Sequence, residues 1–178
     1  MTTNAASSPD IDLSDNPDRR KANRPSISPP VLLYRLGHAL HSSRVPVLPK
    51  IISIINRLAF SCALPSTATI GKEFTLGYWG LGVVIHSKSV IGDRCLISQN
   101  VTLGRKSGSP GVPRLGNNVA VGAGSVLVGD IELGDNCVVG AGSVVTKSFP
   151  DGSVIAGVPA QVLSHLEAGE THSHYLER

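Results

Sequence analysis

Aromatic side chains are scarce in this chain of 178 residues, in which Phe, Trp and Tyr together make up 4%. Apolar residues nevertheless account for 41% of the sequence, and glycine occurs 19 times. A core with few rings and many small aliphatic side chains indicates narrow, repetitive packing rather than an ordinary globular interior. The formal net charge is only +3, and no basic stripe with interleaved aromatics is visible, which argues against a nucleic-acid partner.

Cysteines are few and widely separated along the chain. Cys62, Cys95 and Cys137 show no CxxC spacing, and an odd number of cysteines without a secretory signal favours a reducing cytoplasm. Residues 1–29 lack the apolar run of a secretory signal, and they are polar and punctuated by proline. We therefore expect a disordered arm over residues 1–29 and a cytoplasmic location, with the inner face of the membrane as an alternative.

Residues 30–66 contain two stretches with helix-like apolar spacing, 31–41 and 49–63, separated by a proline-containing turn. The second stretch is very apolar, but Lys50, Asn56 and Arg57 interrupt it, and it is shorter than the ~20 residues of a membrane-spanning helix. Two interpretations stay open. The segment packs against the main domain, or it lies in a membrane interface and makes a peripheral membrane contact through residues 49–63.

From residue 70 the chain reads in groups of six. Hexapeptides such as IGDRCL, LGDNCV and VGAGSV open with an aliphatic residue, often followed by glycine, and carry a small or aliphatic residue at the fifth place. This period predicts a parallel β-helix over residues 67–163, with three hexapeptides in each triangular coil and a tail over residues 164–178. Glycine or asparagine at the corners allows a tight or left-handed backbone.

The register of the hexapeptides predicts which side chains are buried. Cys95 and Cys137 fall at the fifth place, an inward site for small residues, so both are expected to pack in the core, and Cys62 in the preceding apolar segment is also expected to be structural. The opening aliphatic residues form the predicted core: Ile70, Leu76, Ile85, Ile91, Ile97, Leu103, Leu115, Val121, Leu127, Leu133, Val139 and Val145.

Two places break the period, and insertions in repeat proteins often gather on the binding face. Ile85 follows Leu76 by nine positions where the period is six, so the segment LGYWGLGVVIH must bulge outward. A second interruption, RKSGSPGVPR at residues 105–114, is rich in glycine and proline and carries three bases.

The segments VIGDRCLISQNVTLGRKSG, VAVGAGSVLVGDIELGDNCVVGAGSVVTK and VIAGVPAQVL resemble the hexapeptide-repeat acyltransferases, and within them the serine acetyltransferase-like group. The segment LGYWGLGVVIH is most similar to a subgroup found among surface-polysaccharide genes. The resemblance implies a left-handed parallel β-helix, a homotrimer with inter-subunit active sites, and acetyl-CoA as the acyl donor without a metal. The family's motif has an Asp-His pair where this chain has Gly77-Tyr78.

Acetyl transfer from a thioester to a hydroxyl requires a base that takes the hydroxyl proton. His86 is the only histidine between residues 68 and 163, and we expect it to be that base. Tyr78 is the alternative catalytic residue, although a phenol titrates near ~10 and suits a supporting role. Tyr78 and Trp79 are expected to line the acceptor pocket, and packing of the bulge against the helices is the simpler alternative for Trp79.

The remaining candidates concern CoA. Gly122, Ala123, Gly140 and Ala141 have side chains small enough for a pantetheine arm to lie along the coil, although tight-turn geometry explains them equally well. Bases suited to the CoA phosphates are Arg105, Lys106, Arg114 and Lys147. Asn100 and Gly104, next to the loop, are expected to face the thioester. Gln161 stands where the family often has a base.

The acceptor is expected to be a small molecule with a hydroxyl, either a sugar of a surface-polysaccharide precursor or L-serine. The alternative function is a non-catalytic hexapeptide-repeat protein that serves as a binding or scaffold module. A γ-class carbonic anhydrase also resembles this repeat, but its zinc needs three histidines and the repeat contains one.

Overall fold

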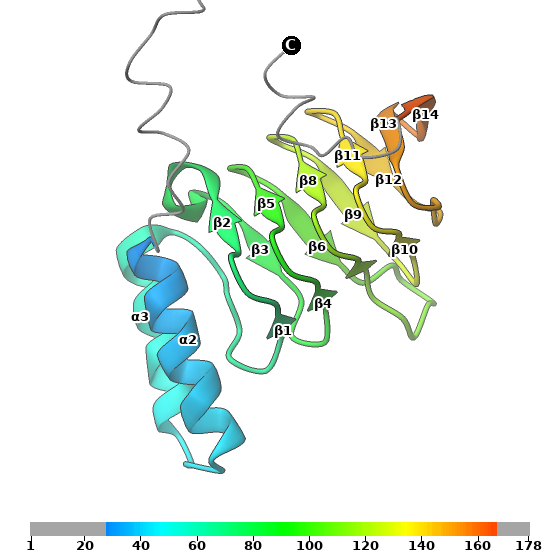
Figure 1. Ribbon diagram of the computed structural model, residues 1–178. Coiled ribbons are helices and arrows are strands. Elements are labelled where there is room, and N and C mark those ends of the chain that lie inside the picture. Colours follow the sequence, from blue (N-terminus) through cyan, green and yellow to red (C-terminus); the bar gives the residue numbers. More distant parts are fainter. Residues whose placement is uncertain (1–27, 167–178) are drawn as a thin grey trace, which may run out of the picture.

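The computed structural model describes residues 28–166 as two helices followed by a β-helix of short strands (Figure 1). Helices α2 (Pro29–Ser42) and α3 (Leu48–Phe60) pack together at the end of the β-helix where the repeat begins. The expected left-handed parallel β-helix with a short helical segment is confirmed. The arm predicted over residues 1–29 and the tail predicted over 164–178 fall almost entirely outside the described residues.

Both expected helices are present, but their ends differ from the prediction. The second helix was expected to reach residue 63, and it ends at Phe60 instead. Ser61 adopts the left-handed backbone with φ of 53°, which stops the helix, and Ala63 then forms a parallel bridge to Val84. The chain therefore passes from α3 into the β-helix within a few residues.

Three parallel sheets form the faces of the β-helix. Sheet A contains β3 (Val84–Ile85), β6 (Thr102–Gly104), β9 (Val126–Val128) and β12 (Val144–Val145). Sheet B contains β1 (Thr69–Ile70), β4 (Val90–Ile91), β7 (Arg114–Leu115) and β10 (Glu132–Leu133). Sheet C contains β2 (Thr75–Leu76), β5 (Leu96–Ile97), β8 (Ala120–Val121), β11 (Val138–Val139) and β13 (Ser153–Gly157), with β14 (Ala160–His165) antiparallel to β13.

The interior of the β-helix is a ladder of aliphatic side chains. Every residue of the predicted core is at most 5% exposed. The parallel register stacks like on like, with Ile91 paired to Leu115 and Leu103 paired to Leu127. The fifth place is inward as predicted, because the side chains there are fully buried: Cys95, Val101, Val119, Ser125, Cys137 and Ser143.

One corner of the β-helix, between sheets B and C, carries a second ladder that joins the coils by hydrogen bonds. Asp93 Oδ1 accepts from the backbone N–H of Lys72 at 2.7 Å, and Asn117 Oδ1 accepts from the N–H of Asp93 at 2.9 Å. Asp135 Oδ1 accepts from the N–H of Asn117 at 2.6 Å, and Asp151 Oδ1 accepts from the N–H of Asp135 at 2.9 Å. Each side chain thus satisfies a backbone donor of the preceding coil, a contact of about 1 kcal/mol.

Helix α2 docks on the first coil through polar contacts. The hydroxyl of Tyr34, a buried side chain, donates to the carbonyl oxygen of Ala68 at 2.7 Å. The Arg35 guanidinium donates to the carbonyl oxygen of Ile70 at 2.6 Å. Carbonyl groups at the open end of sheet B therefore find donors on the helix, which closes this end of the β-helix.

Helix α3 buries only a narrow face. Pro49, Ile52 and Asn56 are its buried residues, and the Asn56 amide nitrogen donates to the carbonyl oxygen of Pro30 at 2.9 Å. This contact joins α3 to the start of α2. The segment therefore packs against the rest of the protein, as one of the two interpretations expected, while most of its apolar side chains stay outside this contact.

Replacing Ile91 by Asp should unfold the β-helix, whereas the same change at the adjacent Val90 should be tolerated. Ile91 is 1% exposed and points into the ladder, whereas Val90 is 41% exposed on the same strand. A carboxylate inside the ladder has no partner and should cost more than about 4 kcal/mol. Thermal unfolding followed by circular dichroism measures both. Equal melting temperatures for the two variants would contradict the register.

Candidate active site

The predicted site residues lie at two corners of the β-helix that border sheet A. The aromatic corner joins sheet C to sheet A and consists of residues 77–82, 98–101, 122–125 and 140–143. The histidine corner joins sheet A to sheet B and consists of residues 86–89, 105–113, 129–131 and 146–148. Tyr78 and His86 therefore lie at opposite ends of β3, and sheet A is the surface between them.

The bulge predicted after Leu76 is a tight turn, η1 (Gly77–Gly80). Tyr78, Trp79 and Gly80 have φ values of 47°, 56° and 78°, so three successive residues occupy the left-handed region. This backbone is costly for two aromatic residues, roughly 1–3 kcal/mol each, and it holds both rings outside the coil. Tyr78 is 79% exposed and Trp79 is 58% exposed.

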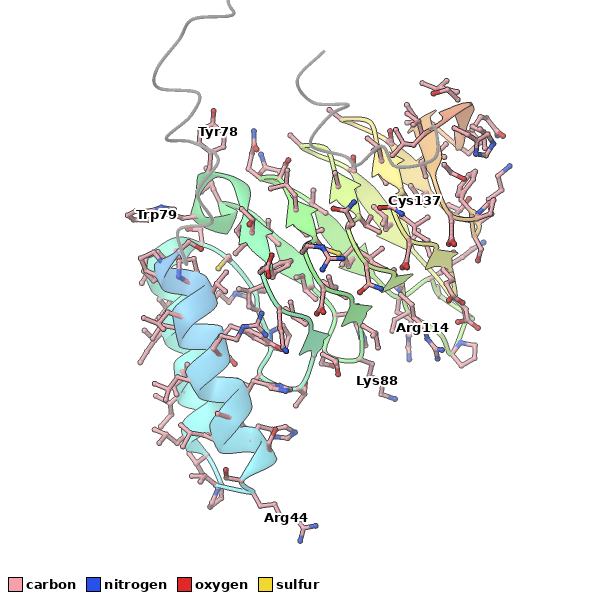
Figure 2. The ribbon with its side chains drawn as sticks, in the orientation of Figure 1. Arg44, Tyr78, Trp79, Lys88, Arg114 and Cys137 are labelled. Atoms are coloured by element: carbon pink, nitrogen blue, oxygen red, sulfur yellow. The ribbon has the colours of Figure 1, made fainter. Side chains whose placement is uncertain are left out.

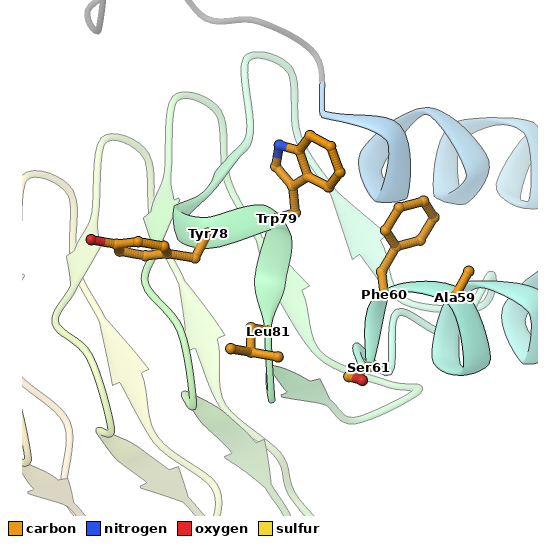
Figure 3. A pocket seen from close by; sticks show the side chains of 6 residues that line it. All are labelled: Ala59, Phe60, Ser61, Tyr78, Trp79 and Leu81. Carbon is orange, nitrogen blue, oxygen red and sulfur yellow. The ribbon is translucent and has the colours of Figure 1, made fainter.

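A pocket of about 540 Å³ lies between the end of α3 and η1 (Figure 3). Trp79 points toward the helices and meets the Phe60 ring edge-on, with 6.1 Å between the ring centroids. Tyr78 points the other way, along the corner. Trp79 therefore packs against the end of the helix and also lines this pocket. The lining contains no Asp, Glu, Lys, Arg or His, and consists of Ala59, Phe60, Ser61, Tyr78, Trp79 and Leu81.

His86 is half-buried at the start of the histidine corner. Its backbone N–H donates to the carbonyl oxygen of Leu103 at 2.9 Å, which fixes the main chain against the next coil. The N–H of Lys88 donates to Nδ1 of the ring at 3.2 Å. Because Nδ1 is then the acceptor, the neutral ring carries its proton on Nε2. In this state the side chain offers a hydrogen-bond donor, and the ring must release Lys88 before a nitrogen lone pair becomes available.

The small residues proposed for CoA stack below η1 at the aromatic corner. The N–H of Asn100 donates to the carbonyl oxygen of Leu81 at 2.8 Å, and the N–H of Gly142 donates to that of Ala123 at 2.8 Å. Asn100 itself has φ of 58°. Asn100, Gly122, Ala123, Gly140 and Ala141 therefore belong to one column of turns with small or short side chains.

The glycines of that column also have a packing reason. A Cβ at Gly122 would lie 2.5 Å from the backbone nitrogen of Ala141, and one at Gly140 would lie 2.8 Å from the Cβ of Ala156. Close approach of neighbouring coils thus requires glycine at both positions without any ligand. The glycines alone carry no evidence for CoA.

The bases proposed for the CoA phosphates do not form one cluster. Arg105 and Lys106 are exposed in the loop after Gly104, whose carbonyl oxygen accepts from the N–H of Gly129 at 3.2 Å. Lys147 lies at the same corner, where its Nζ donates to Gln161 Oε1 at 3.0 Å. Gln161, which stands where the family often has a base, therefore accepts a hydrogen bond from Lys147.

Arg114 belongs to a different face. It opens β7 in sheet B with an outward side chain, and Figure 2 shows it far from Tyr78. The structure thus places Arg105, Lys106 and Lys147 along the histidine corner and leaves Arg114 outside it.

The cysteines are poor nucleophiles, as expected for core residues. Burial raises the pKa of the Cys62 and Cys95 thiols to about 11, and burial likewise raises the pKa of Cys137. All three are free thiols. Within residues 28–166, no group of three or more His, Cys, Asp or Glu side chains is placed to hold a metal ion.

Comparison with known proteins agrees with this architecture. Residues 113–147 match the family described as bacterial transferase hexapeptide (six repeats). A serine acetyltransferase from Synechococcus elongatus is 38% identical over 135 residues, which cover 75% of this chain and 55% of the relative. A serine acetyltransferase from Helicobacter pylori strain J99 is 37% identical over 136 residues, which cover 75% of this chain and 79% of the relative.

Solved structures of serine acetyltransferases are also similar to this chain. The crystal structure of serine acetyltransferase from Brucella abortus strain S19 in complex with coenzyme A has a TM-score of 0.72 and 29% identity, covering 76% of this chain and 54% of that one. The chain thus spans little more than half of that enzyme and of the cyanobacterial relative. With a parallel β-helix, a matching repeat family and relatives of this identity and coverage, the chain belongs to the serine acetyltransferase family of hexapeptide-repeat transferases.

Proposed function

We propose that the protein transfers an acetyl group from acetyl-CoA to a hydroxyl acceptor, with the reaction taking place along sheet A between the aromatic and histidine corners. Membership of the serine acetyltransferase family and a relative's complex with coenzyme A support the donor. One observation supports this placement. His86, the column of turns with small side chains, and the basic residues Arg105 and Lys106 all border sheet A.

The reaction balances without a further reactant. The acceptor oxygen attacks the thioester carbonyl carbon while a base takes the hydroxyl proton, and the carbonyl becomes an oxyanion. Backbone N–H groups of a glycine-rich corner can stabilise that oxyanion. The tetrahedral intermediate then expels the CoA sulfur, which leaves as the thiol after it receives the proton from the base.

The acceptor we favour is a neutral sugar hydroxyl of a surface-polysaccharide precursor. The pocket beside η1 has a size typical of small-molecule sites, and its walls are aromatic and uncharged. L-Serine carries both an ammonium and a carboxylate, and those walls offer no charged partner for either group. L-Serine stays the second candidate, because the relatives are named serine acetyltransferases.

Release of the CoA thiol should therefore be faster with neutral hexoses or N-acetylhexosamines, free or lipid-linked, than with L-serine. Trp79→Ala should raise the KM for the sugar about 10-fold, equivalent to loss of one aromatic contact, and leave the KM for acetyl-CoA unchanged. Val90→Ala, on another face, is the control. Turnover with L-serine and with none of the sugars would refute the proposed sugar acceptor. Absence of thioester cleavage with every acceptor would favour the non-catalytic alternative.

We assign the base to His86. To act, its ring must give up the Lys88 hydrogen bond and accept the proton of the acceptor hydroxyl, which costs about 1 kcal/mol for an exposed contact. Tyr78, at the aromatic corner, is given a part in acceptor binding. No other histidine lies in the repeat.

His86→Ala should lower kcat by roughly 10²–10⁴-fold with the melting temperature unchanged, the usual effect of losing a positioned base. Tyr78→Phe is the matched variant at the other corner, and it should keep kcat within a few-fold. Steady-state kinetics with saturating acetyl-CoA measures both. Normal turnover by His86→Ala together with an inactive Tyr78→Phe would show that Tyr78, not His86, is the base.

The assembly we propose is a homotrimer whose subunits meet along sheet A, so that active sites lie between subunits. The outward side chains of sheet A are uncharged: Val84, Thr102, Val126 and Val144. The outward side chains of sheet B instead include Arg114 and Glu132. Sheet C is uncharged as well, but its outward Ala120 and Val138 are already buried within the subunit, so sheet A is the uncharged face left to bury between copies.

Val126→Arg should convert the trimer to smaller species, because an unpaired guanidinium would enter the subunit contact. Val90→Arg makes the same change on sheet B and should leave the assembly intact. Light scattering at micromolar concentration distinguishes the species. A monomeric unmodified protein, or dissociation by Val90→Arg alone, would contradict the proposed contact.

A further inference from the structure

Helix α3 turns most of its aliphatic side chains away from the protein. Its buried residues, Pro49, Ile52 and Asn56, recur at helical spacing and form the narrow inner face. The outer face repeats with the same spacing, and it is apolar as well. Its exposed members are Leu48, Ile51, Ile54, Ile55 and Leu58, together with Val47 directly before the helix, and we call this set the outer stripe.

The outer stripe is unusual for a helix on a protein surface. Such helices normally place polar residues on the solvent side. Here Ile54 is 56% exposed and Leu58 is 80% exposed, and helix α2 also leaves Leu32 and Leu36 more than half exposed. Contiguous exposed apolar surface of this kind marks an interaction site.

Basic side chains border the outer stripe. Lys50 and Arg57 are exposed, and because they are seven residues apart they lie in one line along the helix, each within one turn of Ile54. Arg44 extends from the turn between the two helices (Figure 2). The sequence contains no acidic residue between Asp18 and Glu73, so these bases have no acidic neighbour within either helix.

We propose that the outer stripe of α3 docks in the interface of an anionic lipid bilayer, with Lys50 and Arg57 at the headgroup phosphates. An apolar face bordered by bases is the pattern of helices that lie in the plane of a membrane interface. The aliphatic side chains enter the acyl boundary while the long basic side chains reach back to the headgroups. Neither helix of residues 28–166 has the length and hydrophobicity to cross a bilayer.

A second copy of the chain fits the stripe less well. Two identical helices that pack about a two-fold axis present the same patch to each other, so Lys50 and Arg57 would approach the same bases of the partner. Neither helix holds an acid that could pair with them. Lipid phosphates supply the missing negative charge. The proposal needs no acetyl transfer, so it stands or falls separately from the proposed function.

The test is sedimentation of the full-length protein with vesicles of pure phosphatidylcholine or of phosphatidylcholine with 30% phosphatidylglycerol. The unmodified protein should pellet with the anionic vesicles and stay in solution with the neutral ones. The double variant Ile51→Ser/Leu58→Ser should bind at least 10-fold more weakly, and Lys50→Gln/Arg57→Gln should lose the preference for anionic vesicles. Both changes lie on exposed side chains, and circular dichroism checks that the fold persists.

Matched controls lie on the β-helix, where Val90→Ser removes an exposed aliphatic side chain and Lys88→Gln/Arg114→Gln removes two exposed bases. Both should bind vesicles as the unmodified protein does. Trp79, the one tryptophan of the chain, lies against Phe60 at the end of α3, so its emission should shift to the blue with anionic vesicles. Unmodified protein that ignores both vesicles, unchanged binding by Ile51→Ser/Leu58→Ser, or a smaller assembly of that variant without vesicles would overturn the proposal.

Discussion

The aliphatic ladder inside the β-helix is the contact on which the rest of this structure depends. Strands of two or three residues cannot be stable singly, and they persist because each coil covers the aliphatic side chains of the next. The ladder restricts the sequence of the strands, because every inward position must hold an aliphatic or small side chain that fills the core. Most candidate site residues therefore lie at corners and interruptions, and the exceptions are Gly104 at the end of β6 and Arg114 at the start of β7.

The period of six predicts the fold well because it reflects this same ladder. All predicted core residues are buried, and both repeat cysteines lie at the inward fifth place. The hydrogen-bonded ladder of Asp93, Asn117 and Asp135 was not predicted, because Asp or Asn after glycine is equally typical of an ordinary turn. The end of α3 was misplaced because Ser61, not glycine, takes the left-handed conformation there.

The site was harder to predict than the fold for a geometric reason. Departure from the period located η1 and the loop after Gly104, but it could not say which corner each would occupy. Counting around the coil places Tyr78 and His86 at the two ends of β3. The hydrogen bond from Lys88 that selects the tautomer of His86 likewise depends on the folded geometry of the corner and cannot be predicted from the sequence. Charge alone suggested Arg114, which the coil carries to sheet B.

Helix α3 shows the limit of apolar periodicity. The sequence pattern left open whether this segment packs on the protein or lies in a membrane interface, because an apolar stripe looks the same for either partner. Its inner face, Pro49, Ile52 and Asn56, packs on the protein. Its outer stripe has more residues than this inner face and is exposed, so one helix can pack on the protein with one face and contact a membrane interface with the other.

The central claim is that CoA lies along sheet A between the aromatic and histidine corners, and amide hydrogen exchange with and without CoA tests it most directly. CoA bound there should slow exchange at residues 98–101, 122–125 and 140–143 and in the loop 105–113. Exchange should not change at the opposite corner, residues 92–95, 116–119 and 134–137. Protection at that opposite corner alone, or no protection at saturating CoA, would contradict it.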